Sequence, residues 1–173
     1  KCEFRLGKIM VPPGKKISLP RDYDPDYTGG FDDREGALEK VAANRERLSK
    51  LQEKLWAQDV YALLVLFQGI DTAGKDGAIR HVMSGVNPQG CQVTAFKAPS
   101  AEELDHDYLW RHQKALPERG RIGIFNRSHY EEVIVVRVHA GILHGQQLPD
   151  AIKNDKDIWK KRYEHIRDWE NHL

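Results

Sequence analysis

A glycine-bearing loop at residues 69–77 constrains the fold of this chain more than any other stretch. Its sequence, GIDTAGKDG, has the G-x-x-x-x-G-K spacing of a phosphate-binding loop. An apolar run at residues 60–67 predicts a strand before the loop, and residues 78–83 predict a helix after it. The glycines permit a tight turn with inward-pointing N–H groups, and the start of a helix favours an anion. We therefore expect a phosphate site here; a strand-to-helix turn that binds nothing is the alternative.

Charged side chains give this loop its expected chemistry. Lys75 adds a mobile positive charge for phosphoryl oxygens. Asp76 stands where most phosphate loops carry Ser or Thr, so the usual hydroxyl ligand for a metal is missing. Asp71 offers a carboxylate inside the loop, so that Mg²⁺, or alternatively Mn²⁺, could be held by acid oxygens instead. The residues of the loop expected to bind nucleotide phosphates are Gly69, Thr72, Ala73, Gly74, Asp76 and Gly77.

Strand and helix patterns alternate along the rest of the chain. Further strands are predicted at residues 91–96 and 122–125. Helices are predicted from Asp32 or Asp33 to about residue 56, at 101–116 behind a Ser100 cap, at 131–138, and from Asp155 or Asp157 onward. The helix at residues 131–138 could instead be a strand, because residues 133–136 are β-branched. A glycine-rich loop is expected at residues 141–145.

This alternation predicts an α/β fold, a three-layer α/β/α parallel sheet with helices on both faces. We expect an N-terminal arm at residues 1–33 and a core at residues 34–173. The buried stripe expected for the first long helix is Ala37, Leu38, Val41, Leu48, Leu51, Leu55 and Trp56. The stripe expected for the last helix is Ile158, Trp159, Tyr163, Ile166 and Trp169.

Composition limits the expected location and partners. A chain of 173 residues with 40% hydrophobic residues fits one soluble α/β domain, and its net charge of +1 predicts no polyanion partner by itself. No run approaches the about 18 apolar residues that a membrane span needs, and the N-terminus carries no signal-like run. Cys2 and Cys91 lack metal-ligand spacing, which favours reduced thiols. We expect a cytoplasmic protein with no membrane partner.

Polar residues follow each predicted strand, where ligands of parallel sheets bind. Lys97 follows the second strand, and Asn126 and Arg127 follow the third. Asn126 stands where phosphate-loop enzymes usually carry an acid near the metal, and Glu131 could restore that carboxylate or serve as a charge at a helix start. Arg127 could clamp phosphoryl oxygens or form a structural salt bridge. The expected metal ligands are Asp71, Asn126 and Glu131.

Cationic residues near these strand ends outnumber what one nucleotide triphosphate needs, so a long anionic co-substrate is expected. The main set is Lys75, Arg80, Lys97, Arg111 and Arg127, with Arg119, Arg121 and Arg137 as further candidates. Nucleic acid is not expected as a partner, because aromatic stacking platforms are not interleaved with these cations. Among the histidines, His129 is expected to form a hydrogen bond at a helix start rather than to bind a metal.

Several motifs together resemble the family-2 polyphosphate kinases, from roughly Tyr27 to the end of the chain. Besides the phosphate loop, the motifs are FKAP at residues 96–99, DYLWR at 107–111, GIFNRSHYE at 123–131 and WKKRY at 159–163. The NRSHYE form is most similar to the branch whose members accept nucleoside mono- and diphosphates, since other branches tend to show DRSWY there.

The resemblance implies a P-loop kinase-like fold and Mg²⁺-dependent, reversible phosphoryl transfer between inorganic polyphosphate and AMP or ADP, with ATP among the nucleotides. It implies catalytic roles for Asp71, Lys75 and Arg127, and polyphosphate binding by Arg80, Lys97 and Arg111. A homo-oligomer, dimer or tetramer, is also expected. Such enzymes continue with a further strand and a cationic lid, whereas this chain stops at Leu173, so we expect a C-terminally truncated form. An ATP-dependent small-molecule kinase and an inactive nucleotide- or polyphosphate-binding module are the alternatives.

Overall fold

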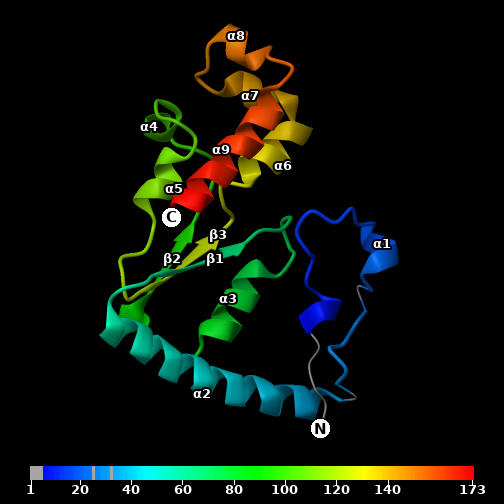
Figure 1. Cartoon of the computed structure of the whole chain (residues 1–173), viewed down its shortest axis with the longest axis vertical. Coiled ribbons are helices and arrows are strands. Elements are labelled where there is room, and N and C mark those ends of the chain that lie inside the picture. Colours follow the sequence, from blue (N-terminus) through cyan, green and yellow to red (C-terminus); the bar gives the residue numbers. More distant parts are fainter. Residues whose placement is uncertain (1–5, 25, 32) are drawn as a thin grey trace. The chain divides into compact units, whose positions relative to one another are not determined.

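The computed structural model describes residues 6–24, 26–31 and 33–173 (Figure 1). Contacts divide the chain into two units, residues 1–47 and residues 48–173, and each is described by itself. Cys2 and the alternative helix cap Asp32 lie outside the described residues, as do residues 1–5 of the expected arm. The arm boundary at residue 33 remains a prediction.

The first unit contains two short helical turns and the start of a long helix. The elements are η1 (Leu6–Lys8), α1 (Leu19–Asp22) and α2 (Arg34–Gln58), which continues into the second unit. The carboxylate of Asp33 accepts a hydrogen bond from the backbone N–H of Gly36 at 2.7 Å, so Asp33 begins α2 as the sequence predicts. The hydroxyl of Tyr23 donates a hydrogen bond to the carbonyl of Met10 at 3.0 Å. This bond connects two parts of the segment that precedes α2.

Three parallel strands form the sheet of the second unit. They are β1 (Leu63–Phe67), β2 (Cys91–Ala95) and β3 (Ile122–Asn126), in the order β1-β3-β2. Both outer strands begin in register with the start of β3, because Leu63 and Cys91 each pair with Ile122. The central strand is the most buried, as expected for a parallel strand covered on both faces.

Helices cover both faces of this sheet and complete the expected α/β/α layers (Figure 1). On one face, Ile122 and Ile124 of β3 pack against Ile79 of α3 (Lys75–Met83) and Leu55 of α2. On the other face, Phe125 of β3 meets Phe96 edge-on with ring centroids 4.8 Å apart. The remaining elements are η2 (Pro88–Gly90), α4 (Ala101–Leu104), α5 (Trp110–Lys114), α6 (Glu131–Val138), α7 (Ala140–Gly145), α8 (Asp150–Lys153) and α9 (Ile158–His172).

Two of the predicted elements differ from the structure. The helix expected at residues 101–116 is split into α4 and α5, because the Asp107 carboxylate accepts from the N–H of Leu109 at 2.9 Å and stabilises a turn between them. The Ser100 cap is present as a capping box with Glu103. The glycine-rich loop expected at residues 141–145 is instead the short helix α7, whose Leu143 packs with Val136 and Ile158.

The expected apolar stripes are also partly wrong. Leu51 of α2 is 50% exposed and Trp56 is 41% exposed, whereas Gln52 is buried because its amide packs directly against Gly90. In α9 the buried line runs through Ile158, Arg162 and Ile166, and the expected Tyr163 is 44% exposed. Within the described residues, no helix combines the length and apolar character that crossing a bilayer requires.

Candidate active site

The loop at residues 69–77 connects the end of β1 to the start of α3, as the glycine spacing predicts. Gly74 precedes the helix with φ 83°, a left-handed conformation that costs glycine little. A Cβ on Gly69 would lie 3.3 Å from the Cβ of Ala73, so the loop closes tightly on itself. Thr72 also takes a positive φ of 66°. The first turn of α3 therefore opens directly onto this loop.

Lys75 turns back over the loop that carries it. Its ammonium donates to the carbonyl oxygens of Gly69 and Ile70, both at 2.8 Å. The next residue, Asp76, accepts a hydrogen bond from the side-chain amide of Asn126, which joins the loop to the end of β3. The lysine charge and one loop carboxylate are thus fixed beside the carboxyl ends of two strands.

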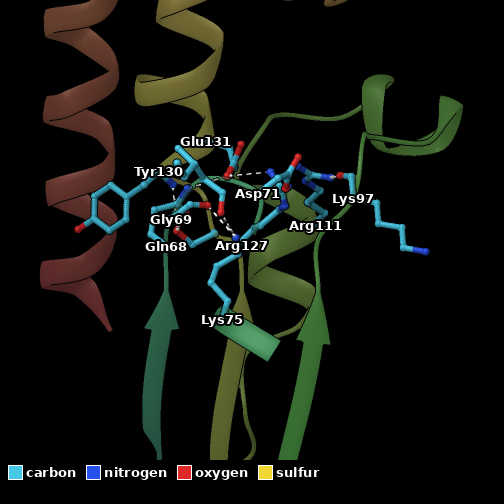
Figure 2. Close-up of polar contacts among 11 residues, drawn as sticks. Gln68, Gly69, Asp71, Lys75, Lys97, Arg111, Arg127, Tyr130 and Glu131 are labelled. Atoms are coloured by element: carbon cyan, nitrogen blue, oxygen red, sulfur yellow. Dashed lines mark hydrogen bonds and ion pairs between the residues drawn. The ribbon is translucent and has the colours of Figure 1, made fainter. Parts of the chain in front are cut away.

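Arg127 links the phosphate loop to α6 (Figure 2). Its guanidinium forms an ion pair with Asp71 and a second one with Glu131, at 3.4 Å. The backbone at Arg127 has φ 64°, and its N–H donates to the carbonyl of Phe67 at 3.0 Å. Since a positive φ is uncommon for a residue with a side chain, the turn after β3 is held in an unusual shape that aims Arg127 at the loop.

Gln68 organises the carboxylate of Glu131 from the other side. Its amide donates to Glu131 Oε1 at 2.6 Å, and its carbonyl accepts from the hydroxyl of buried Ser128 at 2.9 Å. Glu131 is therefore held between an amide and a guanidinium. Sequence reasoning did not single out Gln68, although its position directly after the apolar strand marked it as a residue at the carboxyl edge of the sheet.

The phosphate loop and the ends of β2 and β3 surround a cavity of about 470 Å³ at the carboxyl edge of the sheet, which Gln68 and Glu131 do not line. Predicted site residues in its wall are Asp71, Thr72, Gly74, Lys75, Asp76, Gly77, Lys97, Asn126 and Arg127. Lys97 is exposed, and Figure 2 shows its side chain extending away from the pair formed by Asp71 and Arg127. The structure thus brings together residues from all three strand ends.

Other predicted cations are placed differently. The Arg111 side chain is 8% exposed, lies over the Phe96 ring at 5.4 Å and donates to the carbonyl of Lys97 at 2.8 Å. Arg80 is exposed on α3 and lines neither this cavity nor the neighbouring one. Arg119 and Arg121 precede β3 and so lie at the opposite edge of the sheet from the loop.

A second cavity, of about 610 Å³, adjoins the first. Phe96, Lys97 and Arg127 line both cavities. The remaining wall is mainly apolar and comes from the loop after β2 and from α4, α6 and α7; it includes Pro99, Leu104, Val135, Val136 and Ile142. An apolar hollow beside a cationic one suits a ligand with a flat apolar part and a charged part.

Sequence reasoning missed the polar residues of this second cavity. Glu132 and Gln146 line it, and both bind Arg162 of α9, which is buried. Arg162 occupies a position of α9 where helical spacing predicts an apolar residue. That departure from the pattern, together with the WKKRY motif at residues 159–163, was the signal in the sequence that could have identified it.

Two buried histidines lie behind the turn that carries Arg127. Burial lowers the pKa of His112 to about 3, and the neighbouring Arg111 adds to the effect. Burial also lowers the pKa of His129, although a hydrogen bond to Glu170 acts in the opposite direction. His129 Nε2 donates to Glu170 Oε1 at 3.0 Å, and Tyr130 donates its hydroxyl to the same oxygen at 2.7 Å. The end of α9 therefore holds two residues of the turn. At the start of α6, the carbonyl of His129 accepts from the N–H of Glu132 at 3.1 Å, while its side chain bonds Glu170.

The oxygen donors near the loop fit a Mg²⁺ ion that is shared with a substrate. Mg²⁺ usually takes one or two carboxylates and fills its other positions with phosphate oxygens and water. Asp71 is 82% exposed at the loop, so its carboxylate can reach such an ion. Within the described residues, no group of three or more His, Cys, Asp or Glu side chains forms a ready metal cage. Of the expected ligands, Glu131 is already bound by Gln68 and Arg127.

Comparisons with known proteins agree with this geometry. The sequence model of one family, described as "Polyphosphate kinase 2 (PPK2)", matches residues 31–173. The chain is 51% identical over 174 residues to an ADP-polyphosphate phosphotransferase of Rhodopseudomonas palustris, covering 99% of this chain and 57% of the relative. It is 43% identical to an AMP/ADP-polyphosphate phosphotransferase of Meiothermus ruber, covering 97% of this chain and 58% of the relative.

A solved structure shows the same fold. The crystal structure of polyphosphate kinase 2 from Arthrobacter aurescens TC1 matches with a TM-score of 0.78 and 39% identity, over 94% of this chain and 54% of that one. The chain thus spans a little over half the length of these relatives. With a family match over most of its length and a shared parallel-sheet fold, the chain belongs to the polyphosphate kinase 2 family.

Proposed function

We propose that the protein transfers phosphoryl groups reversibly between inorganic polyphosphate and AMP or ADP, with Mg²⁺. The printed names of the relatives from Rhodopseudomonas palustris and Meiothermus ruber support this reaction. The observation that carries the proposal is the pair of joined cavities. One holds Lys75, Asp71 and Arg127, and the other is apolar and large enough for a nucleoside.

The residues of the first cavity would act by positioning and by neutralising charge. The acceptor is already a phosphate oxygen, so no strong base is required. The loop N–H groups and Lys75 bind the transferring phosphoryl group, and Arg127 binds its oxygens after releasing Asp71. Asp71 is then free to orient the acceptor phosphate or to hold Mg²⁺. Asn126 and Glu131 would join it as ligands by exchanging their present contacts with Asp76 and with Gln68 and Arg127. When bound, Mg²⁺ supplies charge stabilisation at the phosphoryl oxygens.

Polyphosphate would extend from the loop along the cationic rim beside β2. Lys97 and Lys114 both line a further hollow of about 410 Å³ next to β2. Lys114 is a further candidate for binding polyphosphate, besides the predicted Lys97 and Arg111. The sequence did not single it out. Arg111 acts there by shaping the rim, since its guanidinium is already bound to the Lys97 carbonyl. Arg80 would contribute only to a polyphosphate chain that reaches α3.

Phosphoryl transfer to AMP and to ADP tests the proposal directly. The assay supplies polyphosphate and Mg²⁺ and follows ADP and ATP by chromatography, with Asp71→Ala beside it. Asp168→Ala is the matched control, because Asp168 is an exposed acid of α9 away from the loop. We expect product that is lost in Asp71→Ala and kept in Asp168→Ala. Use of ATP alone as donor would overturn the polyphosphate assignment, and binding without turnover would favour a binding module.

Several expectations stay predictions alongside this function. The homo-oligomer, dimer or tetramer, is checked by light scattering after gel filtration. The cytoplasmic location and the absence of a nucleic-acid partner rest on the sequence arguments given above. Mn²⁺ is tested as the alternative ion by substituting it for Mg²⁺ in the transfer assay.

A further inference from the structure

Glu132, a wall residue of the apolar cavity, belongs to a buried ion pair with Arg162. Arg162 Nη1 lies 3.2 Å from Glu132 Oε2, and the two side chains are only 5% and 4% exposed. Arg162 Nη1 also donates to the Glu132 carbonyl at 3.1 Å, and Nη2 donates to Gln146 Oε1 at 2.6 Å. The Arg162 guanidinium lies over the Tyr108 ring at 5.0 Å. The pair is thus held firmly from several sides.

The hydrogen bonds of this group leave one polar atom available to the cavity. Gln146 donates to Glu132 Oε2 at 2.7 Å while its oxygen accepts from Arg162, so both ends of the amide are engaged. The other carboxylate oxygen, Glu132 Oε1, accepts no hydrogen bond from the part of the chain that the structure describes. It is also not among the fully buried atoms of those residues that lack a partner. Glu132 lines this cavity and also a smaller one of about 60 Å³. Only the larger cavity has room for a base, so a base that meets Oε1 would do so there.

A carboxylate at this depth selects both the orientation and the chemistry of a ligand. It repels phosphate, so the phosphates of a nucleotide would stay at the mouth beside Lys97 and Arg127, and the base would enter the apolar part. An ionised carboxylate only accepts hydrogen bonds, so it favours a base edge that donates an N–H. A carbonyl oxygen on that edge would be repelled instead.

We propose that Glu132, fixed by Arg162 and Gln146, reads the base of the acceptor nucleotide by accepting a hydrogen bond from an amino group such as the 6-amino group of adenine. This inference rests on the proposed function, because it takes the apolar cavity as the acceptor's nucleoside site. A site built to bond a polar group rejects the analogue that lacks it, since the site's own polar atom is then left unpaired.

Equilibrium binding to the unmodified protein tests the proposal without any need for turnover. Calorimetry would compare AMP with purine riboside 5′-monophosphate, which lacks only the 6-amino group, and with IMP, which carries a carbonyl there. A hydrogen bond to a charged group predicts about 10- to 100-fold weaker binding of purine riboside monophosphate and weaker binding still of IMP. Equal affinities for AMP and purine riboside monophosphate would overturn the proposal.

Two variants place the effect at the cavity. Glu132→Gln should shrink the preference for AMP to less than about 3-fold, whereas Glu118→Gln, an exposed acid far from the cavity, should keep it. Ile142→Trp fills the mouth of the cavity at a side chain that is 44% exposed, and so is compatible with folding. This substitution should weaken the binding of AMP at least about 10-fold while leaving the binding of tripolyphosphate unchanged. Unchanged AMP binding in Ile142→Trp would overturn the placement of the base.

Failure of the base reading and failure of the proposed function give different results. Transfer from polyphosphate to AMP with no discrimination between AMP and purine riboside monophosphate would reject the role of Glu132 alone. Discrimination in binding without any transfer from polyphosphate would keep the role of Glu132 and reject the reaction. If Glu132→Gln fails to fold, the comparison of AMP with purine riboside monophosphate still decides the proposal.

Discussion

Two neighbouring glutamates of α6 form the same kind of group in two different surroundings. Glu131 binds the amide of Gln68 at 2.6 Å and the guanidinium of Arg127 at 3.4 Å. Glu132 binds the amide of Gln146 at 2.7 Å and the guanidinium of Arg162 at 3.2 Å. We call these the loop trio, formed by Gln68, Arg127 and Glu131, and the floor trio, formed by Glu132, Gln146 and Arg162.

The two trios differ in burial and in the freedom of the arginine. Arg127 is 30% exposed and also pairs with Asp71, so it has two acidic partners and access to solvent. Arg162 is 5% exposed and lies among aromatic rings as well as its polar partners. An arginine with accessible, exchangeable partners can move onto a phosphate, whereas a buried arginine serves to hold a carboxylate in place. We therefore expect Arg127 to act on the substrate and Arg162 to position Glu132.

Removing the arginine of the floor trio should have the largest effect on stability. Arg162→Met leaves the Glu132 carboxylate buried without its counter-charge, which lowers the free energy of unfolding by about 3–5 kcal/mol. Urea denaturation measures this loss. The double variant Arg162→Met with Glu132→Leu should recover most of it, because it removes both charges together. A small loss in the single variant would contradict the assignment of Arg162 as a fixed support.

The second-largest expected effect is a loss of stability in acid, caused by the buried His112. Unfolded histidine binds a proton near pH 6.5, whereas folded His112 does so only near pH 3. Between these values the unfolded state binds more protons than the folded state. The contribution of His112 to the free energy of unfolding is therefore fully present above pH 6.5 and decreases as the pH falls toward 3. The loss from this residue is at most roughly 5 kcal/mol, at 1.36 kcal/mol per pH unit.

Denaturation midpoints measured between pH 7 and pH 4 would show this slope. His112→Phe removes the titrating group while keeping a ring of similar shape against Phe96, so its slope should be shallower than that of the unmodified protein. Identical slopes in both proteins would show that His112 is not the group responsible.

Removing the arginine of the loop trio should reduce phosphoryl transfer strongly and stability only slightly. Arg127→Ala removes a positioned donor and is expected to reduce phosphoryl transfer about 100- to 1000-fold. Its ion pairs are partly exposed, so the free energy of unfolding should change by less than about 1 kcal/mol. Steady-state kinetics and urea denaturation on one preparation test both halves. A large loss of stability with transfer intact would exchange the roles of the two trios.

The smallest expected effect connects α9 to the loop trio. Glu170→Gln weakens the hydrogen bonds that Glu170 accepts from His129 and Tyr130, and should lower the free energy of unfolding by about 1 kcal/mol. Because these residues flank the Arg127 turn, transfer should decline several-fold through kcat, with KM for AMP nearly unchanged. The exposed pair at Arg167 and Asp168 offers the control Asp168→Asn. An increase in KM alone would assign Glu170 to binding instead.

Local patterns predicted the parts of the molecule that depend on neighbours in sequence. The loop at residues 69–77, the three strands, the Ser100 cap and the grouping of Asp71, Lys75 and Arg127 follow from spacing and from the rule that ligands meet the carboxyl ends of parallel strands. The site roles of these residues remain predictions until activity is measured.

Features that depend on distant partners were not predictable in this way. Helical spacing marks position 162 as buried but gives no reason for an arginine there, because its partners Glu132 and Gln146 lie 30 and 16 residues away in the sequence. Likewise, Gln52 replaces the expected Leu51 as the buried residue of α2 because Gly90 leaves space for its amide. In each case a tertiary contact, absent from the local pattern, decided which side chain is buried.

The position of Lys75 has a consequence for the energetics of anion binding. Its ammonium already has two carbonyl acceptors within its own loop, so an arriving phosphate exchanges hydrogen bonds instead of adding them. The net number of bonds made by Lys75 changes little, and the heat released there should be small. Attraction for the ligand then comes mainly from its charge, and it weakens as salt screens that charge. The loop would accordingly discriminate among anions by valence more than by shape.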